Sequence, residues 1–451
     1  MANSYTVAVL GAVVSWAASG CADTHTGPAP LVARELFLAS PRPGVHVNAH
    51  TFYTSRSGTS LISCHGESTR SDTTDSIWQR FSSDNGRTWT PAVRVATSQP
   101  TARGTHRRYR RPGFVDPATG VLLTMVIEGT LPTDNPLEGM KHWTLRYELS
   151  RDGGHTVWHE GPVVENAPGY SAEHPLPGVW VGRNGIMIGD TTCIPIGLRN
   201  GAILVPVQIC PVGPHGTYHN PGGGYTYHDA AVLIGRWNGS GRLDWRLSAL
   251  VRGDPARSTR GVLEPTLAEL PDGRVLMVLR GSNDRKPGLR GYRWHAFSRD
   301  GGVTWSEPQP WTYTDGEPFF SPSSCSQLLT HSTGRLYWIG NISPTNPRGN
   351  LPRYPLVIGE VDTRSGLLAR ESLRTIDDRG PDDTETLRLS NFYAREDRAT
   401  RDILVHCSPY GRGGAVLNAS ATSRPAQRLL DSTGDAFLYR IRMMSGATAG
   451  R

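Results

Sequence analysis

An acid and a base stand at the two ends of one predicted hairpin. The segment EPTLAELPDGRVLMVLR runs from Glu264 to Arg280, and Pro-Asp-Gly at 271–273 is typical of a tight turn. Asp272 is the midpoint of the segment, so a fold at that residue makes Glu264 and Arg280 cross-strand neighbours. An exposed ion pair at this place would contribute about 0–1 kcal/mol. In a cleft, the arginine could instead bind a carboxylate and the glutamate could transfer a proton.

A second group of candidate residues combines histidine with arginine. The segment RGTHRRYRRPGF, if it is a strand, places His106, Arg108 and Arg110 on one face. Arginine that neutralises a uronate carboxylate makes the neighbouring C5 proton acidic, and His50 or His106 could remove that proton. This chemistry is β-elimination, with Arg108 as a carboxylate ligand. The alternative is a solvated strand edge that blocks aggregation.

Further histidines crowd a glycine-rich segment. HGTYHNPGGGYTYHD contains His215, His219 and His228, and its glycines favour a flexible loop over a cleft. The histidine spacing follows no known ligand motif, and the cysteines lack CxxC spacing. We therefore predict neither a metal site nor a cofactor, and we consider one disulfide, Cys193–Cys210.

The composition favours many short strands. The 451 residues include 51 Gly, 34 Pro and 12 Trp, which is typical of strands joined by tight turns. The net charge is +7, and all basic residues except Lys141 and Lys286 are arginine. Arginine suits carboxylates, phosphates and sulfates. The excess charge is scattered, which argues against a nucleic-acid partner.

The N-terminal residues have the character of a targeting segment. Residues 5–20 are apolar but too short and too weakly hydrophobic for a stable membrane span. They precede Cys21 in AASGC, which resembles a lipoprotein cleavage box. We expect a secreted, cell-surface or periplasmic protein that crosses no membrane. The expected division of the chain has three parts: a signal sequence at 1–21, a linker at 22–40 and a single domain at 41–445.

Three segments repeat one turn motif. They read SSDNGRTW, SRDGGHTVW and SRDGGVTW, with Val157 inserted in the second copy. In such a turn the Asp accepts bonds from backbone amides, a Gly takes the left-handed conformation and the Trp packs beneath. The aspartates of the three copies are Asp84, Asp152 and Asp300.

The motif matches the Asp-box of sialidase-type β-propellers. Weaker echoes lie at 234–245 and 358–367, and a last strand at 436–443 could close a ring. This spacing predicts an all-β fold of six four-stranded antiparallel blades, although seven also fit. Long loops on a rigid propeller are places where sites form.

Residues from about 40 to 445 resemble the sialidase superfamily. The resemblance implies that the Asp-boxes are structural and lie away from the catalytic face. It implies that Glu264 and Arg280 line the central cleft, and that Arg353 is a further member of an arginine triad. The acid/base Asp of the family would fall at Asp72, with Asp75 close enough to compete.

Two residues of the family pattern are replaced. Asn48 stands where the first triad arginine is expected, and Leu389 stands at the position of the nucleophilic tyrosine, although Tyr393 is near. A sialidase uses tyrosine because its substrate's own carboxylate would repel a carboxylate nucleophile. The remaining residues therefore favour an acidic sugar other than sialic acid.

Three functions remain open. The first is an exo-acting glycosidase for an oligo- or polysaccharide that carries an acidic sugar, with Asp72 as the acid and Glu264 as a base or nucleophile partner. The second is a polysaccharide lyase that cleaves a uronate-containing glycan by β-elimination, with a histidine, His50 or His106, or a tyrosine as the base. The third is a glycan-binding propeller without catalysis. We expect a monomer in each case.

Overall fold

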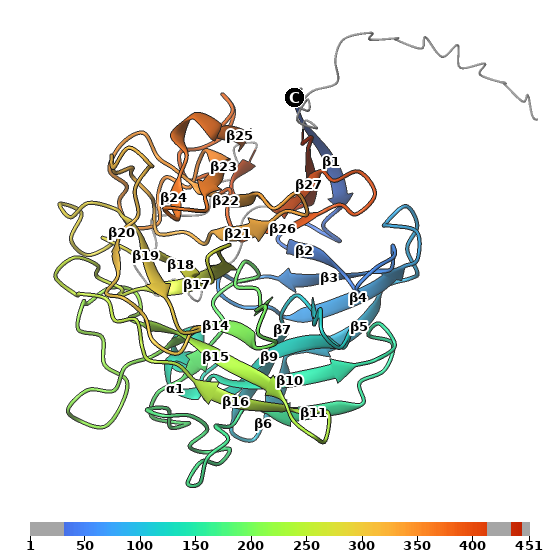
Figure 1. Cartoon of the computed structure of the whole chain (residues 1–451), viewed down its shortest axis with the longest axis vertical. Helices are drawn as coiled ribbons and strands as arrows, with labels where there is room; N and C mark the ends of the chain where they lie inside the picture. The colour runs from blue at the N-terminus through green and yellow to red at the C-terminus, as the bar shows by residue number, and fades with distance from the viewer. Residues whose placement is uncertain (1–30, 413–433, 444–451) are drawn as a thin grey trace, which may run out of the picture. The chain divides into compact units, whose positions relative to one another are not determined.

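The computed structural model describes residues 31–412 and 434–443. They form six antiparallel sheets arranged as a six-bladed β-propeller, which confirms the predicted fold and the count of six (Figure 1). The expected signal sequence at 1–21 lies outside the described residues.

Each of the first three blades is one sheet built from consecutive strands. The first contains β2 (His46–Tyr53), β3 (Leu61–Ser68), β4 (Ser76–Ser82) and β5 (Val93–Thr97). The second contains β6 (Gln99–Thr101), β7 (Gly104–Arg110), β8 (Phe114–Val115), β9 (Leu122–Leu131), β10 (Thr144–Ser150) and β11 (His159–Pro162). The third contains β12 (Ile186–Met187), β13 (Ile196–Gly197), β14 (Ile203–Ile209), β15 (Asp229–Trp237) and β16 (Leu243–Leu247).

The last three blades complete the ring. The fourth contains β17 (Leu263–Glu269), β18 (Val275–Arg280), β19 (Arg293–Ser298) and β20 (Gln309–Pro310). The fifth contains β21 (Gln327–Thr330), β22 (Leu336–Asn341), β23 (Leu356–Asp362), β24 (Leu367–Leu368) and β25 (Arg374–Asp377). The sixth contains β26 (Tyr393–Glu396), β27 (Ile403–Cys407), β28 (Ala436–Ile441) and β1 (Val32–Leu38).

Strand β1 closes the ring as the outer strand of the sixth blade. It pairs antiparallel with β28, with Val32 opposite Ile441. Residues 32–38 are therefore part of the propeller, whereas the sequence predicted a linker over 22–40. Pairing with an N-terminal strand covers the edge of β28, which would otherwise present unpaired backbone groups.

Helix is nearly absent from the described residues. Only η1 (Pro136–Glu138), α1 (Gly139–His142) and η2 (Arg370–Ser372) interrupt the strands there. No helix in those ranges has the length and apolar character of a membrane span.

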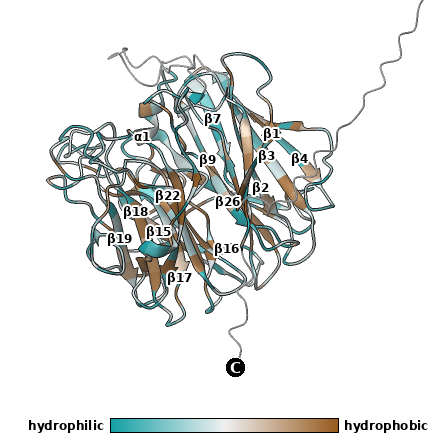
Figure 2. Ribbon diagram, turned by 90° about the horizontal axis from the view of Figure 1, so that it is seen from above, coloured by the Kyte–Doolittle hydropathy of each residue, from teal (hydrophilic) through white to brown (hydrophobic). Residues whose placement is uncertain are grey.

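The core lies between neighbouring blades. Hydrophobic residues are concentrated on the strands, and the connecting loops are mostly hydrophilic (Figure 2). Between the fourth and fifth blades, Trp311 and Trp338 are fully buried, with ring centroids 5.5 Å apart in an edge-to-face arrangement. Such packing makes the blades a rigid support for the loops at their ends.

The three Asp-box turns share one set of hydrogen bonds. In each, the Ser hydroxyl donates to the Asp Oδ1 at 2.8 Å. A Gly amide donates to the same Ser Oγ at 2.8 Å, and the Thr amide donates to the Asp Oδ1 at 2.9 Å. The second copy differs because Val157 displaces its tryptophan, and Trp158 is 36% exposed under the guanidinium of Arg151. Asp84, Asp152 and Asp300 thus hold turns at the ends of β4, β10 and β19.

The described cysteines are all free and buried. The Cys193–Cys210 disulfide considered from the sequence is therefore not formed. Instead, the Cys210 thiol contacts the Met140 sulfur at 3.6 Å, and the Cys193 sulfur accepts a bond from the amide of Asp190 at 3.5 Å.

Candidate functional site

Glu264 and Arg280 contact each other as predicted, but a β-bulge, and not direct cross-strand pairing, brings the two side chains together. Arg280 lies opposite Leu263, and the register of β17 and β18 shifts between Leu263 and Thr266. Pro265 falls inside this shift, and proline is tolerated within sheets at bulges because it lacks an amide proton. Glu264 has φ of +48°, and its Oε1 accepts a hydrogen bond from Arg280 Nη1 at 2.6 Å.

Arg280 and Arg353 meet at one residue of the fifth blade. Arg280 Nε donates to Ser323 Oγ at 2.9 Å, and Arg353 Nη2 donates to the Ser323 carbonyl at 3.0 Å. Arg353 also donates to Ser390 Oγ at 2.9 Å. These partners of Arg353 are uncharged, so its positive charge remains available to an anion.

Glu264 is a buried carboxylate among cations. Its exposed fraction is 9%. Burial alone would raise its pKa, but the ion pair with Arg280 and the charges of Arg260 and Arg353 outweigh it and lower the pKa. Glu264 Oε2 has no hydrogen-bond partner among the described residues. The side chain is therefore ionised, with Oε1 held by Arg280 and Oε2 buried without a hydrogen-bond partner among the described residues.

A second buried carboxylate, Asp190, lies beside Glu264 between β12 and β13. Burial raises its pKa, and so does the negative charge of Glu264. Its Oδ2 accepts a bond from Asn391 Nδ2 at 2.6 Å. Gly189 makes the close approach feasible, because a Cβ at that position would lie 2.4 Å from Glu264 Cγ. The two carboxylates differ in the direction of their pKa shifts, a pattern found where acid and base roles are divided.

Asp72 lies at an exposed position in the loop between β3 and β4. Its Oδ2 accepts a hydrogen bond from the Tyr225 hydroxyl at 3.1 Å. Burial raises the pKa of Tyr225, and the charge of Asp72 adds to the shift. Charges of both Asp72 and Glu264 act on the guanidinium of Arg260, so Arg260 links the two predicted catalytic acids.

Three of the residues that gather here have an unusual backbone. Asp72, Glu264 and Asn391 have positive φ values of 58°, 48° and 60°. Non-glycine residues adopt such values at an energetic cost, and functional sites are places where that cost is tolerated.

His50 and the β7 residue His106, both predicted as bases, have no described contact with Glu264. His50 is 6% exposed, neither ring nitrogen has a partner among the described residues, and burial, with Arg111, lowers its pKa to about 3. His106 Nδ1 lies 3.3 Å from Thr130 Oγ1. No contact described for His106 reaches Glu264. The imidazole of His50 is therefore neutral, and its predicted role as a base stays a prediction, as does that of His106.

Arg108 is neutralised by carboxylates of its own blade. It forms ion pairs with Glu128 at 3.2 Å, Glu148 at 2.8 Å and Glu160 at 2.9 Å. The structure does not bring it to Arg280 and Arg353, and its three partners leave little charge for a substrate carboxylate.

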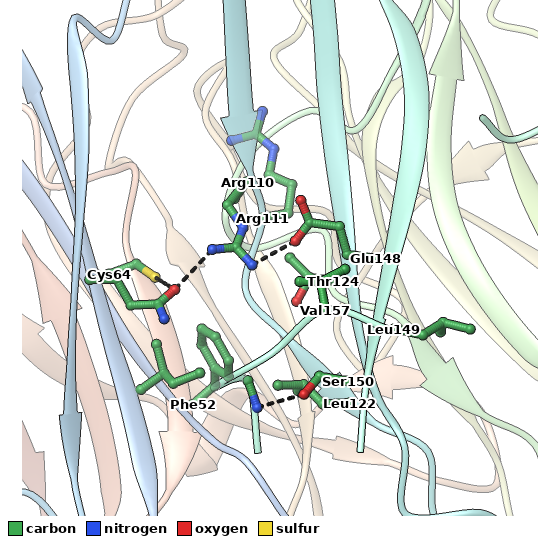
Figure 3. A pocket seen from close by; sticks show the side chains of 13 residues that line it. Phe52, Cys64, Arg110, Arg111, Leu122, Thr124, Glu148, Leu149, Ser150 and Val157 are labelled. Atoms are coloured by element: carbon green, nitrogen blue, oxygen red, sulfur yellow. Dashed lines mark hydrogen bonds and ion pairs between the residues drawn. The ribbon is translucent and has the colours of Figure 1, made fainter. Parts of the chain in front are cut away.

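A small pocket between the first and second blades is separate from this chemistry. Figure 3 shows Arg110 spanning it, with hydrogen bonds to Gln79 at 2.9 Å and to Glu148 at 2.6 Å. Apolar side chains such as Phe52 and Leu122 form much of the rest of its lining. Arg110 is paired with Glu148, whereas Arg111, which also lines the pocket, donates to the carbonyls of Ile188 and Gly189 at 2.9 Å and forms no ion pair with a described carboxylate.

The position expected for the tyrosine nucleophile holds a core residue. Leu389 is fully buried, and burial raises the pKa of the nearby Tyr393 to about 12. Tyr410 stacks on His46 with ring centroids 3.6 Å apart, and it pairs through its backbone with Arg388. Burial raises the pKa of Tyr410, and the charge of Asp72 contributes. Among the tyrosines of the sixth blade, Tyr410 is thus the one whose pKa is raised by the charge of Asp72.

The comparisons agree with this architecture. Residues 181–366 match the model of the BNR repeat-like domain. The chain has a sialidase-type propeller fold.

Solved structures support that fold at low sequence identity. The intramolecular trans-sialidase from Ruminococcus gnavus is 12% identical, with 87% of this chain and 94% of that chain covered and a TM-score of 0.56. The NanB sialidase from Streptococcus pneumoniae is 12% identical, with 91% and 70% covered and a TM-score of 0.55. A protein of unknown function from Dyadobacter fermentans is 15% identical, with 92% and 100% covered and a TM-score of 0.54. A search of curated protein sequences gives no significant match.

Several residues of the site carry no sequence signal. Asp190 and Tyr225 come from loops of the third blade, Arg260 from the connection to the fourth blade and Ser323 from the connection to the fifth, and none belongs to a motif. Pro265 is the exception, because a proline within a strand pattern indicates a bulge. Across residues 31–412 and 434–443, no group of three or more His, Cys, Asp or Glu side chains is placed to hold a metal ion.

Proposed function

We propose that this sialidase-type propeller is a glycoside hydrolase that acts at the end of a glycan carrying an acidic sugar. The observation that carries the proposal is the meeting of Arg280 and Arg353 at Ser323, with Glu264 bonded to Arg280 at 2.6 Å. Two guanidinium groups from different blades form a fork for a carboxylate, and an ionised carboxylate lies beside them.

The proposed roles follow from exposure and charge. Asp72 is the exposed acid and protonates the leaving oxygen. Glu264 has a free Oε2 and accepts a proton from the attacking water, which avoids the repulsion between a carboxylate nucleophile and an acidic substrate. Arg280 and Arg353 hold the substrate carboxylate.

The first test is incubation with sialosides and uronate oligosaccharides, followed by ultraviolet absorbance and by analysis of released monosaccharide. Hydrolysis releases monosaccharide without a rise in absorbance. A rising absorbance from an unsaturated sugar would identify a lyase instead and direct attention to His50. Binding without any product would identify a glycan-binding propeller.

The variant Arg353→Met tests the carboxylate fork. Its hydrogen-bond partners are uncharged, and Glu264 keeps its ion pair with Arg280, so the substitution leaves no buried carboxylate without a partner. Loss of a charged hydrogen bond of about 1.5–3 kcal/mol corresponds to a fall in kcat/KM of about 10- to 100-fold. The control is Arg335→Met, since Arg335 is 56% exposed and lies 3.6 Å from Glu360. Equal kinetics for the two variants would refute the assignment of Arg353.

A further inference from the structure

Arg260 is a buried cation without a carboxylate partner in the part of the chain that the structure describes. It is 6% exposed. Its Nη2 donates to Thr226 Oγ1 at 2.6 Å, and its Nε has no partner. A buried charge without a counter-ion is strongly unfavourable. Arg280, which is equally buried, has Glu264 as its partner, whereas Arg260, like Arg293 and Arg353, forms no ion pair with a described carboxylate.

The backbone that carries Arg260 is fixed. The Thr259 amide donates to the Ser282 carbonyl at 2.9 Å, and Thr259 Oγ1 donates to Asp284 Oδ1 at 2.5 Å. The loop before β15 also packs on the arginine, since a Cβ at Gly224 would lie 2.6 Å from Arg260 Cγ. The glycines of this loop therefore permit close packing, where the sequence favoured flexibility. An arginine held in this way is preorganised.

Arg260 lies within electrostatic range of Arg280 and Glu264. Burial lowers the pKa of Arg260, and the charge of Arg280 adds to the shift. Burial also lowers the pKa of His228 well below its usual value, as do the charges of Arg260 and Arg280. The neutral His228 thus lies near both guanidinium groups. Tyr225, whose ring centroid is 5.5 Å from the Arg260 guanidinium carbon, bonds to Asp72.

The charge balance at this place favours an anion. Three guanidinium groups, Arg260, Arg280 and Arg353, act on the carboxylate of Glu264. Among the three, only Arg280 forms an ion pair with a described carboxylate, while Asp284 and Asp72 act on Arg260 from beyond ion-pair distance. Such a cluster of cations attracts an anionic ligand. The sequence resemblance predicts Asn48, which brings no charge, at the position of the first arginine of the family pattern.

We propose that Arg260 is a third ligand for the anionic group of the substrate and replaces the arginine that is missing at Asn48. The inference rests on the proposed function, because it places an acidic sugar at Glu264. In this arrangement, Arg260 approaches the carboxylate from the connection between the third and fourth blades, Arg280 from the fourth blade and Arg353 from the fifth.

The test is calorimetric titration of the full chain with N-acetylneuraminate and with D-glucuronate, with D-glucose as the neutral probe. The variants are Arg260→Met, Arg260→Lys, Arg353→Met and the exposed control Arg335→Met. We expect Arg260→Met to weaken binding of an acidic sugar at least tenfold, Arg260→Lys to weaken it less, and Arg335→Met to leave it unchanged.

Thermal unfolding provides a second measurement that separates binding from structure. A residue kept for binding can be replaced by methionine without a loss of Tm, because the substitution removes an unpaired buried charge. If Arg260→Met binds as the wild type does while Arg353→Met loses binding, the role of Arg260 is refuted and the proposed function stands. If the wild type binds neither acidic sugar and releases no product, both fail. A fall in both Tm and binding for Arg260→Met, with full binding retained by Arg260→Lys, supports the proposal, because a positive charge then suffices.

Discussion

Replacing Glu264 by glutamine tests the electrostatic account of the site most directly. Glutamine keeps the shape and one oxygen for Arg280, but it removes the negative charge that pairs with Arg280 and acts on Arg260 and Arg353. Breaking a buried ion pair by loss of one partner costs about 3–5 kcal/mol. An unfolding entropy of about 2.1 cal/mol/K per residue over ~400 residues is about 0.8 kcal/mol/K, so Tm should fall by about 4–6 °C.

The pH dependence gives this prediction its sign. The pKa of Glu264 is lowered in the folded protein, so its stabilisation is present above the unfolded pKa of about 4.3 and is lost as the pH falls through the folded value. The difference in Tm between wild type and Glu264→Gln should therefore be full at neutral pH and shrink below about pH 4.3.

The assay is differential scanning calorimetry of both proteins from pH 7 downward. Glu360→Gln is the matched control, because its side chain is 37% exposed and lies 3.6 Å from an exposed arginine. Such a surface pair contributes about 0–1 kcal/mol. If Glu264→Gln unfolds at the same temperature as Glu360→Gln at pH 7, the ion pair with Arg280 does not stabilise the fold as argued.

Two further predictions concern residues outside the site. Asp300→Ala removes the acceptor of the Ser298 hydroxyl and of the Thr304 amide. It should therefore lower the free energy of unfolding by about 1–3 kcal/mol, while KM and kcat stay at their wild-type values. A loss of activity without a loss of Tm would contradict the structural role of Asp300. The described cysteines are buried, and burial raises the pKa of each thiol, so a thiol reagent should modify them only after denaturation. Denatured, unreduced protein should then titrate five more thiols than native protein, and a difference of three would indicate a disulfide. These thiols are Cys64, Cys193, Cys210, Cys325 and Cys407.

The sequence was informative where structure is local. The Asp-box turns depend on residues within seven or eight positions of one another, and their spacing predicted six blades. The spacing of Glu264 and Arg280 about a Pro-Asp-Gly turn predicted their contact. The bulge was missed, because symmetric counting placed Glu264 rather than Leu263 opposite Arg280. Pro265 was the available signal.

The rest of the site could not be read from local patterns. Tyr225 is 153 positions from Asp72, to which it bonds, and Asp190 is 201 positions from Asn391. These contacts exist because the ring brings different blades to one centre. The pairing of β1 with β28 was missed for the same reason, since its partner is at the other end of the described chain (Figure 1).

The register of the fourth blade separates two ends with opposite physical character. Ser298, which begins an Asp-box, pairs with Val275 next to the turn of the hairpin, whereas Arg280 pairs with Arg293 at the other end of the same strands. The Asp-box end satisfies its polar groups with short local bonds. The end that holds Glu264 carries a buried ion pair with Arg280 and a buried arginine, Arg260, that forms no ion pair with a described carboxylate. A fold selected for stability alone would not keep these buried charges. The Asp-box turns and the core between the blades are stable enough to tolerate their energetic cost. Substrate binding and catalysis should therefore be sought at the end of the propeller that holds Glu264, and not at the Asp-box end.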